Sequence, residues 1–180
     1  MIKINLENTY DPKYVNDEFT YFIFDSELAD ETSIELHVTI EPHTDQYLPN
    51  VYNLGFGPSD GLGSFDDKFK AKHKNRHKLF STVLLYGILF LEQNKDLSIG
   101  IDGSDDLRAN LYHRMFRYNI SELSELLSIV GVDWYVRLLR NRTEIEKDSN
   151  GNPFFKPRPE IFDTERDAKD LYRYYIYKLN

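Results

Sequence analysis

The residues best placed to do chemistry form one short segment, residues 99–108, with the sequence IGIDGSDDLR. A Gly-Ser turn follows an apolar run, and Ser104 is a natural N-cap for a helix whose first turn carries two aspartates. The free N–H groups of such a helix start point outward and can bind an anion. Arg108 lies one turn into this helix and adds a positive charge. The segment predicts an anion-binding site, for which we select Asp102, Gly103, Ser104, Arg108 and Arg114.

Arg108 itself has two interpretations. On a helical wheel it falls between Tyr112 and Met115 on the apolar arc, and a buried guanidinium needs a carboxylate partner. Asp102, or an acid from the first third of the chain, could be that partner. Arg108 is therefore either half of a fold-stabilising ion pair or a ligand contact. The apolar arc holds Leu107, Leu111, Tyr112, Met115 and Tyr118, and the opposite, exposed arc holds Asp106, Asn110, His113, Arg114 and Arg117.

The second cationic feature is the run KFKAKHKNRHK at residues 68–78, which has six Lys or Arg, two His and no acid. It follows residues 1–67, whose net charge is −12, and precedes a remainder of −2. Such a run is either a flexible, solvated loop or a contact strip. The overall charge of −8 disfavours nucleic acid as the partner, because phosphate would be repelled. The predicted interaction surface comprises Lys70, Lys72, Lys74, Arg76, His113 and Arg117, with Arg137, Arg140 and Arg142 extending it.

No complete catalytic set can be assembled from the sequence. The chain has no cysteine, which excludes disulfides, thiolate zinc sites and cysteine nucleophiles. His73 and His77 have metal-ligand spacing, but their lysine-rich surroundings would repel a cation. A nucleotidyltransferase would need a carboxylate pair after the Gly-Ser turn, where only Asp133 stands. The glycine-rich residues 55–63 match neither a dinucleotide fingerprint nor a P-loop. We predict no catalytic residue, no metal and no cofactor.

Hydrophobic periodicity predicts the elements that position these residues. Residues 19–28 and 33–41 are predicted to form a hairpin, because residues 33–41 alternate apolar and polar side chains. Residues 77–94 form a helix that is apolar almost all round and therefore buried. The chain end, from Thr164, follows helical spacing. The other predicted elements are strands over 51–56, 97–101 and 132–139, helices over 104–118 and 121–129, and a hairpin of 143–147 with 153–156.

These elements indicate an α+β fold: an antiparallel sheet from the N-terminal strands, packed on a buried central helix, with further helices in the C-terminal half. No linker or repeat divides the sequence, so we expect a single domain over residues 1–180. The first residues lack the features of a signal peptide, and the longest apolar stretch, residues 79–91, is too short to span a bilayer. We expect a cytoplasmic protein with no membrane partner.

Three motifs resemble a family of small uncharacterised bacterial proteins. They are PNVYNLGFG at residues 49–57, KLFSTV at residues 78–83, and the segment from Gly103-Ser104 through Arg108 to Leu111-Tyr112-His113-Arg114. The resemblance covers residues 19–125 and implies a compact α+β domain of no named activity. A second arginine, common in the family beside the position of Arg108, is replaced here by Ala109 and Asn110. That replacement would weaken an anion site shared with the family.

The sequence favours a non-enzymatic protein-interaction module, accessory to a bacterial defence or toxin–antitoxin system. Surfaces rich in Arg and Tyr, together with the basic run, favour a protein partner or a homo-oligomer. One alternative is a phosphate- or nucleotide-binding enzyme or sensor that uses the Gly103-Ser104 helix start and Arg108. Another is nucleic-acid binding through residues 68–78.

Overall fold

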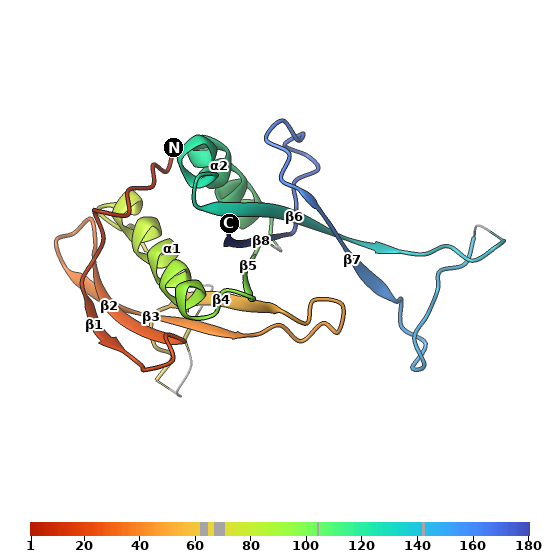
Figure 1. The fold of residues 1–180 in the computed structure, drawn as a ribbon, viewed down its shortest axis with the longest axis horizontal. Coiled ribbons are helices and arrows are strands. Elements are labelled where there is room, and N and C mark those ends of the chain that lie inside the picture. The colour runs from red at the N-terminus through yellow and green to blue at the C-terminus, as the bar shows by residue number, and fades with distance from the viewer. Residues whose placement is uncertain (62–64, 67–70, 104, 142) are drawn as a thin grey trace.

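The computed structural model describes residues 1–61, 65–66, 71–103, 105–141 and 143–180. Within these residues, eight strands form one mixed sheet in the order β1-β2-β3-β4-β5-β8-β6-β7, and two helices accompany it (Figure 1). The fold is α+β, as predicted, but both helices lie mid-chain, and none of the described residues after Leu123 forms a helix. The elements are β1 (Pro12–Val15), β2 (Tyr21–Glu27), β3 (Ser33–Pro42), β4 (Val51–Gly57), α1 (Arg76–Gln93), β5 (Ser98–Asp102), α2 (Asp106–Leu123), β6 (Leu127–Val136), β7 (Phe155–Ile161) and β8 (Tyr174–Leu179).

The first four strands form an antiparallel meander, so the predicted N-terminal strands are confirmed. β2 and β3 pair from Tyr21 with Thr39 to Glu27 with Ser33, which confirms the predicted hairpin. Along β3 the alternation holds, because Leu36, Val38 and Ile40 are all buried. One face of this meander therefore belongs to the core.

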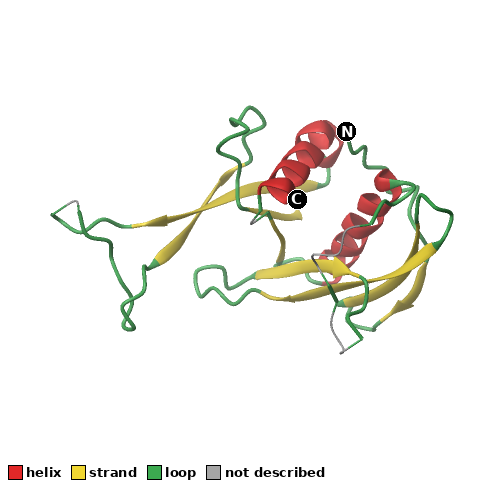
Figure 2. Ribbon diagram, turned by 180° about the vertical axis from the view of Figure 1, so that it is seen from behind, coloured by secondary structure: helices red, strands yellow, loops and turns green. Residues whose placement is uncertain are grey.

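Helix α1 confirms the predicted buried central helix. Asn75 caps it by accepting a hydrogen bond from the Lys78 N–H at 3.0 Å. Its buried residues occupy nearly the whole circumference, from Leu79 to Leu91. α1, α2 and one face of the sheet contribute to a single large apolar core, and a smaller cluster around Val132 and Ile176 lies apart from it. Figure 2 shows both helices against the sheet. Among the described residues, no helix is long and apolar enough to cross a membrane.

The predicted C-terminal helix is wrong, because the chain end forms strand β8 in the middle of the sheet. β8 lies antiparallel between β5 and β6. Tyr175 and Tyr177 enter the large core, while Tyr174 and Ile176 enter the smaller cluster. A strand buried on both faces has apolar residues at every position, and its spacing satisfies a helical pattern as well. Among the interior strands, the predicted strand over 97–101 is confirmed as β5.

A glycine lets the tyrosines of β8 fit across the sheet. Gly100 on β5 lies directly beneath the ring of Tyr174, and a Cβ at this position would overlap the Tyr174 hydroxyl. That hydroxyl donates a hydrogen bond to the side-chain carbonyl of Asn53 on β4. Burial raises the pKa of Tyr174 far above its ordinary value, so the phenol stays protonated. The small residue on β5 thus allows β4, β5 and β8 to be joined through one side chain.

Helix α2 runs further than predicted, to Leu123. The sequence predicted an interruption at Asn119, but the Asn119 amide bonds the carbonyls of Met115 and Ile2 and accepts from the Ile4 N–H. These bonds satisfy the polar side chain inside the core, so the helix continues. The predicted helix over 121–129 is wrong, because β6 begins at Leu127.

The predicted faces of α2 are confirmed only in part. Met115 is buried and Arg114 and Arg117 are exposed, as predicted. Leu107 and Tyr118, placed on the apolar arc, are 73% and 47% exposed, whereas His113, placed on the polar arc, is 4% exposed. The buried face also includes Ala109 and Phe116. Small and aromatic residues on that side fit against Phe162 and Tyr175, and this packing decides the orientation.

The distal ends of β6 and β7 leave the body together and, with their connection, form a projection (Figures 1 and 2). We call residues 135–158 the arm. The predicted strand over 132–139 corresponds to β6, which ends at Val136. The predicted turn at 148–152 is present: the Asp148 carboxylate accepts from the N–H groups of Asn150 and Asn152. The flanking strands of that hairpin are reduced to the bridge between Lys147 and Pro153.

Candidate functional site

Four of the sequence-predicted residues line one pocket of about 1210 Å³ between β4, the basic run and the start of α2. Asp102 and Arg108, predicted for an anion site, face it together with Lys72 and Arg76 of the predicted interaction surface. The two cationic features of the sequence are therefore one site in the fold. The pocket is lined by Leu36, Leu54, Gly55, Phe56, Gly57, Pro58, Asp66, Ala71, Lys72, His73, Arg76, Leu79, Phe80, Asp102, Asp105, Asp106, Leu107, Arg108, Leu111 and Tyr112.

The start of α2 is built differently from the prediction. Asp105, not Ser104, is the N-cap, and its carboxylate accepts from the Arg108 N–H at 2.8 Å. The Arg108 Nε lies 3.2 Å from the second Asp105 oxygen. Arg108 thus has a carboxylate partner, as its fold-stabilising interpretation required, although that partner is Asp105 rather than the proposed Asp102. Ser104 lies outside the described residues.

The described part of the basic run is held against the end of β2 by backbone hydrogen bonds, while Lys72 and Lys74 remain exposed. The Ala29 N–H donates to the Lys72 carbonyl at 2.8 Å, and the Lys74 N–H donates to the Glu27 carbonyl at 2.9 Å. Between them, His73 lies 2.8 Å from the Ser26 hydroxyl. Burial, and next the charge of Arg76, lower the pKa of His73. This pairing directs Lys72 to the pocket, whereas Lys74 forms an exposed ion pair with Glu27.

The glycines of the PNVYNLGFG motif let the chain pass close over β4. A Cβ at Gly55 would lie 2.6 Å from the Phe65 ring, and one at Gly57 would overlap the Asp66 carbonyl. The Asp66 N–H donates to the Pro58 carbonyl at 2.9 Å. Residues 65–66 can therefore lie on the strand only because these two positions have no side chain.

Some predicted residues do not reach the pocket. Arg114 is exposed on α2 but does not line it, and Arg117 pairs with Glu165 at 3.1 Å. Gly103 is buried against Ala109, beside the pocket rather than in it. Lys70 lies outside the described residues, as does part of the stretch predicted to be flexible.

His113 is not a surface residue, which corrects its place in the predicted interaction surface. It is 4% exposed and packs on the Phe162 ring at 5.1 Å. Among the described residues, neither of its ring nitrogens has a hydrogen-bond partner. Burial lowers its pKa, which favours the neutral imidazole.

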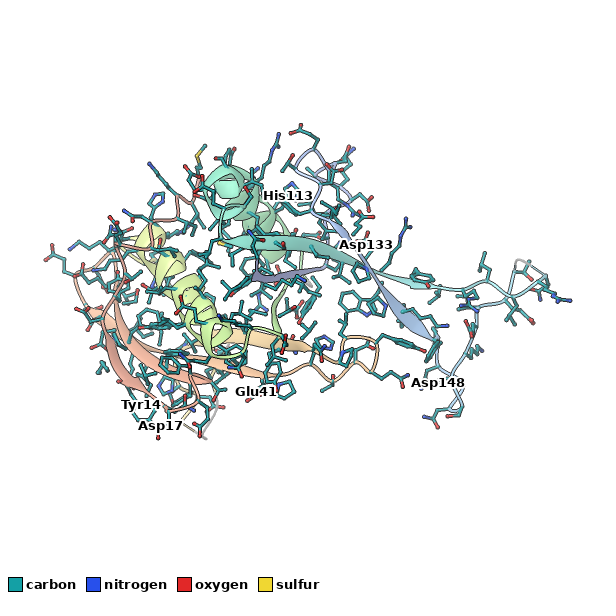
Figure 3. All side chains as sticks on the ribbon, viewed as in Figure 1. Tyr14, Asp17, Glu41, His113, Asp133 and Asp148 are labelled. Atoms are coloured by element: carbon teal, nitrogen blue, oxygen red, sulfur yellow. The ribbon has the colours of Figure 1, made fainter. Side chains whose placement is uncertain are left out.

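The sequence patterns did not predict a second charged cluster, which is centred on Arg166. Its guanidinium lies 2.6 Å from an Asp133 oxygen and 3.0 Å from a Glu160 oxygen, and it stacks 3.9 Å above the Tyr172 ring. Asp133 marks the place where β6 leaves the body (Figure 3). The cluster therefore fixes the base of the arm, and it gives Asp133 a structural partner. No spacing rule connects these residues, which come from three separate segments.

The sequence patterns also did not predict that residues 135–158 form one projecting arm. Tyr135, Leu138, Leu139 and Phe155 are between 43% and 56% exposed. They account for four of the eleven exposed large apolar side chains in the described chain. Such a concentration on one projection is typical of a contact surface.

No group of three or more His, Asp or Glu among the described residues is arranged to hold a metal ion. The model of a family of unknown function, DUF6934, matches residues 6–152. The chain belongs to this family. No curated protein and no solved structure matches.

The family match confirms the resemblance predicted from the motifs, which all lie within residues 6–152. The DUF6934 region contains every described residue that lines the pocket. It stops before β7 and β8, although β8 occupies the middle of the sheet. In this DUF6934 protein, residues beyond the matched region therefore complete the fold.

Proposed function

We propose that this chain is a non-enzymatic protein-interaction module and that the arm is its contact element. The observation that carries the proposal is the group of exposed apolar side chains on a projection outside the core, including Leu138 at 54% and Phe155 at 56%. Exposed to water, these apolar side chains do not stabilise the isolated chain, because they belong to neither core cluster. A partner that buried them would gain about 25 cal/mol per Å² of apolar surface.

The arm is suited to contact through its side chains rather than through strand addition. β7 is the edge strand of the sheet, and it carries Pro157 and Pro159. Proline in an edge strand places its nitrogen on the solvent side and offers no N–H there. Because the two prolines are two residues apart, they remove successive donors from the same edge. A partner strand would find few donors to pair with.

The charge of the arm supports one kind of partner over the others. Residues 135–158 contain six Lys or Arg and three Asp or Glu, so the arm has a net charge of +3 and the rest of the chain −11. Two arms would repel each other, and the acidic body would repel nucleic acid. We propose a protein partner whose acidic surface contains an apolar groove.

The test begins with a photo-crosslinking residue at position 138, introduced in cells that produce the chain naturally. The captured protein is identified, purified and titrated against the purified chain. The double variant Leu138→Glu with Phe155→Glu should weaken binding about tenfold or more, because it puts charges into the apolar contact.

The matched control is Tyr118→Glu, which adds a charge at a comparably exposed apolar residue of α2. It should leave the affinity unchanged. Equal weakening by both variants would contradict the proposal, and so would no loss from the arm variant. Capture of a second copy of this chain would assign the arm to homo-oligomerisation, and capture of nucleic acid alone would overturn the protein partner.

A further inference from the structure

We propose that the arm of one copy of this chain docks on the acidic face of a second copy. This inference rests on the proposed function, because it takes the arm as the contact element and names the surface that the arm contacts. The acidic face comprises outward-facing residues of β1, β2 and β3 and two residues of the β1–β2 turn: Lys13, Tyr14, Asp17, Glu18, Tyr21, Ile23, Asp25, Glu35, His37 and Glu41.

The acidic face lies on the side of the meander that points away from the core. Phe22 and Phe24 of β2 lie in the large core together with residues of α1. Because side chains alternate along a strand, the residues next to them project from the opposite side of the sheet. On that side Tyr14 is 50% exposed, and the side chains of Asp25 and Glu35 are 46% and 44% exposed. A partner can therefore reach this face.

The centre of the acidic face is an ordered row of rings. Tyr14 meets Tyr21 edge-on with ring centroids 5.9 Å apart, and the Tyr21 hydroxyl lies 2.5 Å from Nδ1 of His37. The other ring nitrogen of His37 lies 3.2 Å from a Glu35 oxygen. These contacts fix the rings before binding, so a partner that packs on them loses little side-chain entropy. Tyrosine is also a residue type that often dominates the energy of an interface.

The charges of the face and the arm are opposite. The face has five acids and one lysine, a net charge of −4, and this Lys13 is already held by Asp25 at 3.2 Å and Glu35 at 2.7 Å. The arm has a net charge of +3, and its Arg140 and Arg158 are exposed. Arginine binds both carboxylates and the faces of tyrosine rings. Two arms repel each other, as do two acidic faces, so opposite charges favour an arm-to-face contact between copies.

The arm cannot bind the acidic face of its own chain. β1 and β7 are the two edge strands, and the whole width of the sheet separates them. Figure 3 labels Tyr14 and Asp17 towards one end of the molecule and Asp148 on the arm towards the other. The two surfaces can therefore meet only between copies. Each copy has one arm and one acidic face, so one copy can engage two others, or two copies can close through two equal contacts.

Sedimentation velocity of the full chain tests the contact through complementation. At about 100 μM and low salt, the unmodified chain should form dimers or larger species, which should dissociate as salt is added. The arm variant is Leu138→Glu with Phe155→Glu, and the face variant is Tyr14→Lys with Asp17→Lys. Each variant alone should associate about tenfold more weakly. An equimolar mixture should form a two-chain complex, because the intact arm of the face variant meets the intact face of the arm variant.

The matched control makes the same two changes elsewhere on the surface. Tyr118→Lys with Glu122→Lys alters an exposed tyrosine and an exposed acid of α2. This control should associate as the unmodified chain does. Circular dichroism confirms that every variant is folded, and weakening by the control equal to that by the face variant would overturn the assignment of the face.

The outcomes separate this inference from the proposed function. An unmodified chain that stays monomeric, or a mixture of arm and face variants that stays monomeric, would overturn the arm-to-face contact. If the crosslinking residue at position 138 then captures a different protein, the arm remains a contact element and only the second copy is excluded. If it captures no protein, both proposals fail. Crosslinks from position 138 to β1 or β3 of a second copy would support both.

Discussion

His113 illustrates how a single buried side chain can make the stability of the fold depend on pH. Its imidazole is enclosed by α2 and Phe162, and the charged groups that face it are Arg117, Asp163 and Arg166. Burial and the two arginines disfavour the imidazolium, while the charge of Asp163 favours it. Burial is the largest effect, so the pKa in the folded protein is lowered.

We therefore expect the chain to lose stability as the pH falls from 7 to 5. The unfolded chain takes up a proton near the ordinary histidine pKa of about 6.5, while folded His113 stays neutral, so acid favours unfolding. One such group contributes at most about 1.4 kcal/mol per pH unit. Urea unfolding at pH 5, 6 and 7 should show a smaller pH slope in His113→Leu than in the unmodified chain.

The slope should decrease rather than vanish, because burial lowers the pKa of His73 as well. Met115→Leu is the control, since it changes a buried residue of α2 without removing a titratable group, and it should not affect the slope. An unchanged slope in His113→Leu would show that this imidazole is not buried in its neutral form.

At the level of single residues, the sequence singled out Asp102, Arg108, Lys72 and Arg76, which line the pocket, but not most of the other lining residues. Arg108 was singled out because a cation among apolar residues is unusual, and the cost of burial predicted that it needs a carboxylate partner, but Asp105 takes the place proposed for Asp102. His113 was misplaced because the angular position of a residue does not reveal which side of the helix packs. No sequence pattern indicated the role of Arg166, because only the folded structure brings it next to Asp133 and Glu160.

Among the elements, the reliable predictions were those with a distinctive period or a clear turn. β3 alternates cleanly, and α1 is too long and too apolar for a strand. β8 was mistaken for a helix, although its run YYIYKL is rich in residues that favour strands. A central strand has no exposed face to mark its period. Only the position of β8 between β5 and β6 shows that this segment is a strand.

The prolines of β7 lead to a prediction about that strand. Replacing Pro157 and Pro159 by valine should restore two N–H donors on the free edge of the sheet and promote pairing between copies. Analytical ultracentrifugation at about 50–100 μM should detect larger species than in the unmodified chain. Pro153→Val, at the bridge beside the turn, is the control and should not change the distribution. No difference between the variants would mean that the prolines do not protect this edge.

For the molecule as a whole, the arm is attached to the core without being part of it. Neither core cluster includes a buried residue of the arm. A body contact near its base is the pair of rings Tyr47 and Phe154, 6.0 Å apart. Figure 3 labels Asp148 at one of the arm's outer turns, far from His113 in the body. The arm can therefore change without disturbing the sheet.

Replacing residues 137–154 by Asn-Gly should leave the fold intact. Val136 and Phe155 are cross-strand partners, so a two-residue turn can connect them. Loss of the Tyr47–Phe154 contact removes about 1 kcal/mol, equivalent to a decrease in Tm of about 2–4 °C. Scanning calorimetry measures this, and loss of cooperative unfolding would show that the arm belongs to the core. The shortened chain should no longer bind the arm's partner.

The position of β8 has a consequence for the order in which the chain folds. β5 and β6 are never paired with each other; each pairs with β8, and Tyr177 stands opposite both Ile99 and Ile129. The two halves of the sheet thus remain unjoined until Tyr174–Leu179 have left the ribosome. Before that moment, β5 and β6 both present bare backbone edges, which are sites for mispairing. Closure of the sheet depends on contacts distant in sequence, so it should be the slow and vulnerable step in the life of a newly made chain.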